Sequence, residues 1–198
     1  GIEFLMKKNR ISHISGTGKL TSNTTLEVKN GKKTEIIEAH KIIIATGARP
    51  RSFPGMEIDG KRVISSKEAM VLDAPPKKMI IIGSGAIGSE FAYYYNEFGT
   101  EVHLVEMMDR ILPVEDLDVS REVEKSFKKS GIKMLLGTKV SQIDTLKTKV
   151  KVHTEKDDKK EILEGDVALL AVGVTGNIEN IGLENLGITT DHGAIKIN

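Results

Sequence analysis

The 198-residue sequence contains no cysteine. This absence excludes disulfide bonds, thiolate metal sites and a redox-active dithiol within the chain. A charge imbalance is missing as well, because 29 basic and 28 acidic residues give a net charge of +1. The chain has no bulk field to attract nucleic acid or an anionic membrane, so we expect neither as a partner.

Long apolar runs are also absent. No run approaches the ~20 residues that cross a bilayer, and residues 1–8 lack the hydrophobic core of a secretory signal. The 39% apolar content is enough for a real core. We therefore expect a globular, cytoplasmic protein. Residues 1–9 resemble the end of a helix without a preceding cap, so we expect the chain to be cut from a longer one.

The strongest local pattern begins at residue 79. Four β-type residues, 79–82, are typical of a buried parallel strand, because helices on both faces of such a sheet remove the polar alternation. A glycine loop, 83–88, follows, and then a helical pattern that Gly99 ends. A second strand is predicted over 101–106. The helical pattern consists of Ile87, Phe91, Tyr94, Tyr95 and Phe98.

The glycine loop has the form Gly-x-Gly-x-x-Gly, which is weak evidence alone but gains weight between a strand and a helix. Gly83 permits a tight turn, Gly85 lets a pyrophosphate approach the backbone, and Gly88 lets the helix sit close to the strand. The helix N-terminus offers N–H donors to phosphates. The pattern predicts a dinucleotide site; the alternative is an ordinary βαβ unit that binds nothing.

An acidic residue ends the second predicted strand. Glu106 lies 23 residues beyond Gly83, where a carboxylate can accept hydrogen bonds from the adenosine ribose hydroxyls. The carboxylate would repel a 2′-phosphate, so NAD is favoured over NADP. Arg110, four residues further on, weakens that preference.

Similar reasoning divides the rest of the chain. Short β segments are predicted on both sides of an Asn30-Gly31 turn, and a buried strand is predicted over 41–48. A proline-rich linker, 50–60, follows. The other predicted elements are β segments at 11–15, 19–20, 25–29 and 34–38, a short helix from Ser65 to Leu72, a helix capped by Asp116 or Asp118, a third parallel strand over 132–136, a meander from Val140 to Leu163 and a strand over 167–174.

Two parts of the sequence have the same plan. In each, a three-stranded meander leads into a buried strand with a small-residue end, at 42–47 and at 167–173. The sequence therefore predicts the tail of one nucleotide-binding domain followed by a complete second one. We expect the boundaries at 1–52, 53–180 and 181–198, the last being a return segment. The charge run at 155–160 is interpreted as a solvated hairpin tip.

Four motifs in order resemble the FAD-dependent pyridine nucleotide–disulfide oxidoreductases, most closely the dihydrolipoamide dehydrogenase branch, over essentially the whole chain. They are Ala45-Thr46-Gly47-Ala48, the loop from Gly83 to Glu90, the segment from Glu106 to Pro113, and Ala171-Val172-Gly173. The resemblance implies an α/β fold, a Rossmann-like parallel sheet with a three-stranded β-meander, plus a meander remnant of an FAD-binding domain.

The resemblance also implies a flavoenzyme that carries electrons from a dihydrolipoyl group through a cysteine pair to FAD and on to NAD. The complete enzyme would be a homodimer within a 2-oxo acid dehydrogenase-type complex. This chain has neither the family's FAD-phosphate loop, nor its cysteine pair, nor its interface domain with the catalytic His–Glu pair. We therefore expect no catalytic residue and no activity in the chain alone, and the five histidines suggest no metal site.

Carried over by position, the NAD loop would comprise Gly83, Ser84, Gly85, Ala86, Ile87, Gly88, Ser89 and Glu90. Glu90 would reach toward the junction of nicotinamide and flavin, and Glu106 would hold the ribose. Val140 would border the adenine, unless it is only a core residue, and Gly173 would approach the nicotinamide, unless it is a plain turn glycine. The positions matching FAD contacts are Gly18, Thr46, Gly47 and Ala48.

One departure leaves alternatives open. After Gly173 the family often has an arginine and a proline, whereas here Val174 and Thr175 follow. Mercuric reductase, glutathione-like reductase and transhydrogenase relatives therefore remain alternatives. A reading of a different class is a stand-alone NAD-responsive binding module, although the sequence shows no recognition helix or apolar stripe for an output.

Overall fold

The computed structural model describes residues 1–197 and divides into two compact units. Unit 1 combines residues 1–49 with the C-terminal stretch from residue 175, and unit 2 is Pro50–Val174. The chain passes between the units within β4 (Ala48–Pro50) and β13 (Val174–Gly176), which pair with each other. None of the helices in residues 1–197 has the length and apolar character that a bilayer crossing requires.

Unit 1 is built on a three-stranded antiparallel sheet of order β1-β2-β3. The turn between β2 and β3 has Gly31 at φ 57°, which confirms the predicted hairpin. The elements of unit 1, apart from β4 and β13, are α1 (Ile2–Lys8), β1 (Thr17–Leu20), β2 (Thr25–Asn30), β3 (Lys33–Glu38), the 3₁₀ helix η1 (Glu184–Leu186), β14 (Thr190–Asp191) and β15 (Ala194–Ile195).

The prediction of a buried strand over 41–48 is wrong. Residues 41–47 form no strand, and the side chain of Ile43 is 90% exposed. A parallel strand depends on hydrogen bonds to neighbouring strands, and the sheet of unit 1 ends at β3. The apolar pattern is typical of a strand, but the described residues supply no strand with which this segment could pair. The segment 11–15 likewise forms no strand.

Unit 2 is organised around a parallel sheet, as predicted. Its order is β5-β12-β6-β7-β8, and each neighbouring pair is parallel. The third parallel strand that the sequence predicts is β8, paired with β7. The strands are β5 (Val63–Ile64), β6 (Lys78–Ile82), β7 (Glu101–Val105), β8 (Lys133–Leu135) and β12 (Val167–Leu170).

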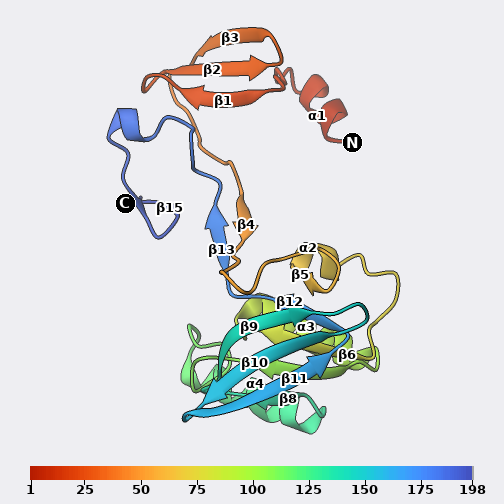
Figure 1. Ribbon diagram of the computed structural model, residues 1–198. Coiled ribbons are helices and arrows are strands. Elements are labelled where there is room, and N and C mark those ends of the chain that lie inside the picture. The colour runs from red at the N-terminus through yellow and green to blue at the C-terminus, as the bar shows by residue number, and fades with distance from the viewer. Residues whose placement is uncertain (198) are drawn as a thin grey trace. The chain divides into compact units, whose positions relative to one another are not determined.

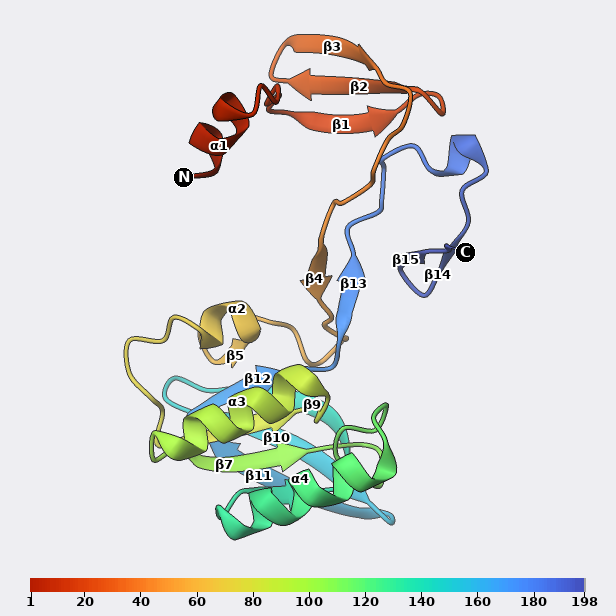
Figure 2. The ribbon, with the colours of Figure 1, turned by 180° about the vertical axis from the view of Figure 1, so that it is seen from behind.

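Both faces of this sheet are covered. Figure 1 shows the antiparallel meander β9–β11 over one face, and Figure 2, from behind, shows helices α3 and α4 over the other. Along β6, Met79 and Ile81 pack on the helical side while Ile80 and Ile82 pack on the meander side. All four are nearly or fully buried, which is why this strand reads as a continuous apolar run. The covering elements are α2 (Ser66–Ala69), α3 (Ala86–Glu97), α4 (Leu117–Lys129), β9 (Lys139–Thr145), β10 (Val150–Lys156) and β11 (Lys159–Gly165).

The helix ends follow the predicted signals. Ser65 and Glu68 form a capping box at α2, and the side chain of Asp116 accepts a hydrogen bond from the Asp118 amide at the start of α4. Gly99 follows α3 with φ 83°. The face of α3 differs from the expected one, because Ala92 and Tyr95 are buried while Tyr94 and Phe98 are 49% and 61% exposed.

The close contact of α3 with β6 depends on Gly88. A Cβ atom added there would lie 1.9 Å from the carbonyl oxygen of Gly83, whose backbone cannot retreat because its own amide is bonded to Val105. At Gly85, three residues earlier, an added Cβ would meet no atom within 4 Å. The two loop glycines therefore differ in what they do: Gly88 permits packing, and Gly85 leaves space.

We predict that Gly88→Ala destabilises the protein by about 1–3 kcal/mol, the usual cost of overpacking a tight site. The measurement is the free energy of unfolding in urea. Gly85→Ala is the matched control, because it adds the same methyl group to the same loop, and it is expected to change stability by no more than about 0.5 kcal/mol. Equal losses in the two variants would contradict this account.

Glu101, the first residue of β7, is a carboxylate with basic partners. Its carboxylate accepts hydrogen bonds from Lys133 Nζ at 2.7 Å and from His103 Nε2 at 2.9 Å, and these bonds lower its pKa to about 2. A carboxylate with a depressed folded pKa adds stability above its unfolded pKa of about 4.3, and this is lost as the pH falls toward about 2. Because Glu101 is 46% exposed, solvent screening keeps the effect small.

We expect Glu101→Gln to lower the free energy of unfolding by about 0.2–1 kcal/mol near neutral pH. The difference from the wild type should shrink as the pH falls below about 4. Urea unfolding at several pH values measures it. Glu122→Gln is the control, since that carboxylate lies 3.8 Å from Lys125 with both side chains largely exposed. A Glu101→Gln deficit that stays constant with pH would contradict the assignment.

Candidate functional site

A pocket of about 560 Å³ lies in unit 2 where the parallel strands end. Its walls come from the segments that follow β6, β7 and β12, together with the start of β9 and residues 53–56. In open parallel sheets, ligands bind beyond the carboxyl ends of the strands. The lining residues are Phe53, Met56, Ile82, Gly83, Gly85, Val105, Glu106, Met107, Thr138, Lys139, Val140, Ala171, Val172 and Gly173.

The glycine loop forms one side of this pocket. Gly83 turns the chain with φ 95°, and a Cβ there would lie 2.5 Å from the carbonyl oxygen of Ala171. Gly85 is the N-cap of α3 and makes no side-chain cap hydrogen bond. The first-turn N–H groups of a helix have no acceptor within the helix, so this end of α3 presents donors and a positive dipole end beside an open space.

Glu106 directly follows β7 and is only 8% exposed. Its Oε2 accepts hydrogen bonds from the Ser84 amide and the Ser84 hydroxyl, both at 2.8 Å, and its Oε1 accepts one from the Met108 amide at 2.9 Å. The structure thus brings the acid to the glycine loop, as its spacing predicts. It also shows a feature that the spacing did not reveal, because the carboxylate fastens the loop to the end of β7.

Arg110 lies outside the pocket lining. Its Nη2 donates to the Pro113 carbonyl at 2.7 Å and to the Glu115 carbonyl at 3.4 Å. The guanidinium is therefore engaged with the loop that leads into α4. The basic residue in the pocket lining is instead Lys139, which the sequence did not single out.

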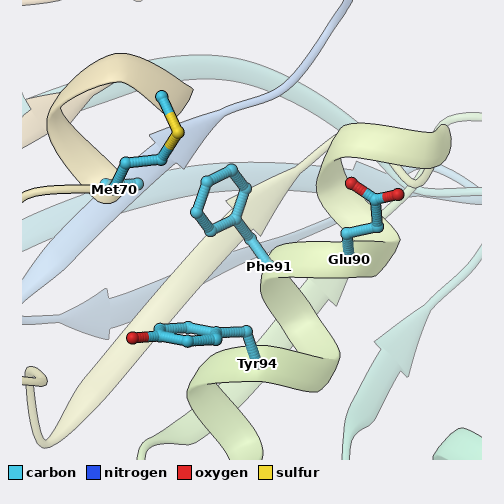
Figure 3. A pocket seen from close by; sticks show the side chains of 5 residues that line it. Met70, Glu90, Phe91 and Tyr94 are labelled. Atoms are coloured by element: carbon cyan, nitrogen blue, oxygen red, sulfur yellow. The ribbon is translucent and has the colours of Figure 1, made fainter.

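Glu90 is separated from the other loop residues. It lines a different pocket, of about 370 Å³, with Ala69, Met70, Phe91 and Tyr94. Figure 3 shows its carboxylate on the first turns of α3, and Phe91 and Tyr94 further along the same helix. Of the rest of the loop, Ser84 and Ser89 are buried, Ile87 is half-buried and Ala86 is exposed.

Val140 and Gly173 both line the main pocket. Val140 is also packed against the core on the meander side, so its two interpretations are not exclusive. Gly173 has φ 96°, and an added Cβ there would meet no atom within 4 Å. Sequence reasoning missed Phe53 and Met56, which form a wall from outside the βαβ unit. Their only signal was an apolar residue on each side of a Pro-Gly turn, a pattern with no chemistry of its own.

The four positions matched to FAD contacts lie in unit 1. Gly18 is in β1, where an added Cβ would be 3.5 Å from the side chain of Leu26. The Thr46 carbonyl accepts a hydrogen bond from Asn177 Nδ2 at 3.2 Å, and the Gly47 carbonyl accepts one from the Asn177 amide at 2.9 Å. Ala48 begins β4. Gly18 therefore lies in the sheet, apart in sequence and in structural element from the other three.

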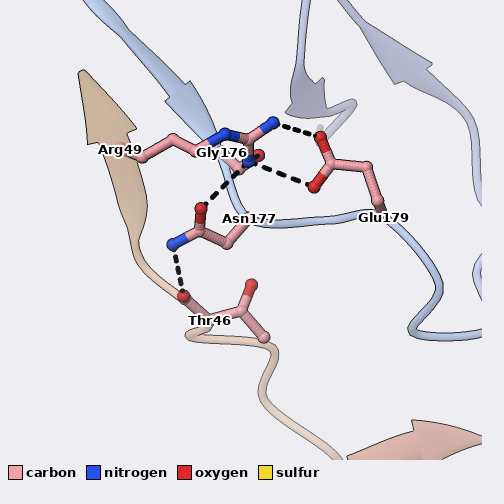
Figure 4. Close-up of polar contacts among 5 residues, drawn as sticks. All are labelled: Thr46, Arg49, Gly176, Asn177 and Glu179. Atoms are coloured by element: carbon pink, nitrogen blue, oxygen red, sulfur yellow. Dashed lines mark hydrogen bonds and ion pairs between the residues drawn. The ribbon is translucent and has the colours of Figure 1, made fainter. Parts of the chain in front are cut away.

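Arg49 secures the segment that follows Ala48. Figure 4 shows its guanidinium between Asn177 and Glu179, with bonds of 3.0 Å to Asn177 Oδ1 and 2.6 Å to Glu179 Oε1. The hydrogen bond from Arg49 lowers the pKa of Glu179 to about 2. The salt bridge from Arg49 to Glu179 and the hydrogen bonds to Asn177 join residues 46–49 to residues 176–179 within unit 1.

The histidines His103 and His153 are engaged with acidic side chains of the fold. His103 is buried in β7, where burial lowers its pKa, and His153 pairs with Asp144 at 2.6 Å. Within residues 1–197 no three His, Asp or Glu side chains converge in a way that would hold a metal ion.

Comparison with known proteins connects this site to a family. The model of the pyridine nucleotide-disulphide oxidoreductases matches residues 1–198. The chain is 39% identical to the dihydrolipoyl dehydrogenase of Bacillus subtilis, over 100% of this chain and 44% of that protein. It is 43% identical to the dihydrolipoyl dehydrogenase of Zymomonas mobilis, over 100% of this chain and 43% of that protein.

Solved structures of similar proteins match the fold of this chain. LpdA from Mycobacterium tuberculosis superposes with a TM-score of 0.86 at 30% identity, covering 97% of this chain and 43% of that one. The flavoprotein disulfide reductase RclA from Escherichia coli gives 0.82 at 28% identity, covering 100% of this chain and 46% of that one. The chain thus spans less than half the length of the relatives it matches. The family match covers the whole sequence, and the chain belongs to the pyridine nucleotide-disulphide oxidoreductase family.

Proposed function

We propose that unit 2 binds NAD, and that the chain is the NAD-binding portion of a flavin-dependent dihydrolipoamide dehydrogenase. The observation that carries the proposal is the pocket in which the open side of Gly85, the N-terminus of α3 and the Glu106 carboxylate meet. These are the groups that a dinucleotide needs for its pyrophosphate and its ribose.

The residues present fit this ligand. Gly85 leaves an opening that a side chain would fill, and the N–H groups of the first turn of α3 can receive a pyrophosphate. Val105, Met107 and Val140 give the pocket apolar surface for a planar base. A pocket of about 560 Å³ lies within the usual size range of small-molecule sites.

The contribution of this chain would be orientation. NAD, when bound, supplies the hydride-accepting nicotinamide ring, and FAD in the complete enzyme supplies the flavin that delivers the hydride. Gly83 and Gly85 shape the space for the pyrophosphate, Glu106 fixes the ribose through its remaining acceptor position, and Gly173 leaves room beside the far half of the dinucleotide. Holding two rings in a defined geometry is a large part of what a protein contributes to such a reaction.

The remaining parts of the proposal concern the longer protein. Residues 1–52 would be the C-terminal piece of a split FAD-binding domain, with Gly18 and residues 46–48 near the flavin, and 181–198 would return toward that domain. The names of the relatives, dihydrolipoyl dehydrogenases, support dihydrolipoyl groups as the electron source. We propose in addition that the longer protein is a homodimer within a 2-oxo acid dehydrogenase-type complex. Because the chain has no cysteine, we propose that it is catalytically silent alone.

Another disulfide reductase is the second candidate. It is favoured by the sequence after Gly173, which lacks the expected arginine and proline, and by the similarity to RclA, a disulfide reductase. A gene that continues on both sides of this chain would separate these enzymes from a stand-alone NAD-responsive module.

Calorimetric titration of the 198-residue chain tests the nucleotide assignment. We expect NADH to bind and NADPH to bind more weakly, because the Glu106 carboxylate meets the 2′-phosphate. No binding by a folded chain, or tighter binding of NADPH, would refute the assignment.

The same titration with the Gly85→Ala variant tests whether the opening at Gly85 holds the ligand. The added methyl group would occupy the opening beside the start of α3, so we expect NADH affinity to fall at least about tenfold with unchanged stability. Gly18→Ala is the control, because that glycine faces Leu26 in unit 1 and its added Cβ is at an ordinary contact distance of 3.5 Å.

A further inference from the structure

Ser84, between the first two glycines of the loop, is fully buried and uses every polar group it has. Its amide and its hydroxyl both donate to Glu106 Oε2 at 2.8 Å. Its carbonyl accepts from the Ser89 hydroxyl at 3.0 Å and from the Leu112 amide at 2.9 Å. Ser84 therefore connects the loop to the end of β7, to the first turn of α3 and to the segment before α4.

Three hydrogen bonds hold the Glu106 carboxylate in place. A carboxylate offers about four acceptor positions, and three are taken, two on Oε2 by Ser84 and one on Oε1 by the Met108 amide. One position remains on Oε1 for a ligand. Moving the carboxylate away would break charge-assisted hydrogen bonds of a residue that is only 8% exposed.

A basic residue is also part of the pocket lining. Lys139 lines the pocket together with Glu106, and an ammonium group is a good partner for a phosphate. A 2′-phosphate entering this pocket would be attracted by Lys139 and repelled by Glu106. Which effect prevails depends on whether the carboxylate stays in place, because the repulsion between two charges falls with their separation.

We propose that the Ser84 hydroxyl determines cofactor selectivity, by holding the Glu106 carboxylate in the pocket wall against a ligand's 2′-phosphate. The inference rests on the proposed NAD binding and deepens it. Ser84 acts as a positioning residue, since its hydroxyl is directed to Glu106 and its effect on the ligand passes through that carboxylate. Removing the hydroxyl leaves the carboxylate with two hydrogen bonds in place of three, from the Ser84 amide to Oε2 and from the Met108 amide to Oε1, so it is held less firmly against a 2′-phosphate.

The test is calorimetric titration of the 198-residue chain and its Ser84→Ala variant with NADH and with NADPH. The ratio of the NADPH to the NADH dissociation constant should fall about tenfold in the variant, the effect of one charge-assisted hydrogen bond. Ser120→Ala is the matched control. Ser120 is 1% exposed and, like Ser84, has a hydrogen-bonded hydroxyl, but this hydroxyl donates to the backbone carbonyls of Leu112 and Asp116, both at 3.2 Å, and not to Glu106. Its ratio should stay within about twofold of the wild type.

A Ser84→Ala protein that binds NADH with an unchanged ratio overturns the inference and leaves NAD binding intact. A folded wild-type chain that binds neither nucleotide overturns the proposed function itself, so the two failures are distinguishable. Ser84→Gly removes the same hydroxyl and adds no atom. It replaces Ser84→Ala in the titration if that variant does not fold. If both variants lose NADH binding while Ser120→Ala retains it, the hydroxyl builds the site rather than setting its selectivity, and the inference fails.

Discussion

The carboxylate of Glu106 is the point on which the site in unit 2 depends. Glu106 directly follows strand β7, and its bonds to Ser84 join the end of that strand to the glycine loop, while its bond to the Met108 amide fixes the segment after the strand. The backbone reinforces the junction, because the Gly83 amide bonds the Val105 carbonyl and the Glu106 amide bonds the Leu135 carbonyl. A buried carboxylate is stable only when hydrogen-bonded, so the same bonds that satisfy this charge also set the shape of the pocket.

The central sheet could be predicted from the sequence because its signals are local. Continuous apolar runs mark strands covered on both faces, and glycines and capping residues mark the ends of helices. The spacing from Gly83 to Glu106 placed the loop and the acid together, since a strand, a helix and a second parallel strand leave little freedom in where the chain returns. The fold class and the closeness of the glycine loop to Glu106 are therefore readable from the sequence.

The errors arose where a local pattern needed a distant partner. Residues 41–47 have a strand-like sequence, but strand formation depends on a neighbouring strand that the described residues do not provide. Tyr94 and Phe98 match the helical period but lie on a half-exposed side of α3. Phe53 and Met56 line the pocket from a segment whose sequence carries no ligand signal. The hydroxyl bond from Ser84 to Glu106 also depends on side-chain geometry, which motif spacing does not encode.

Amide hydrogen exchange with and without NADH tests the central claim, that unit 2 holds the dinucleotide at the junction of loop and acid. We expect added protection at residues 83–90, 105–108 and 171–173, where the loop, the acid and the end of β12 enclose the ligand. The sheet of unit 1, β1 to β3, should be unchanged. Protection confined to unit 1 or to the pocket beside Tyr94, or no protection at saturating NADH, would contradict the account.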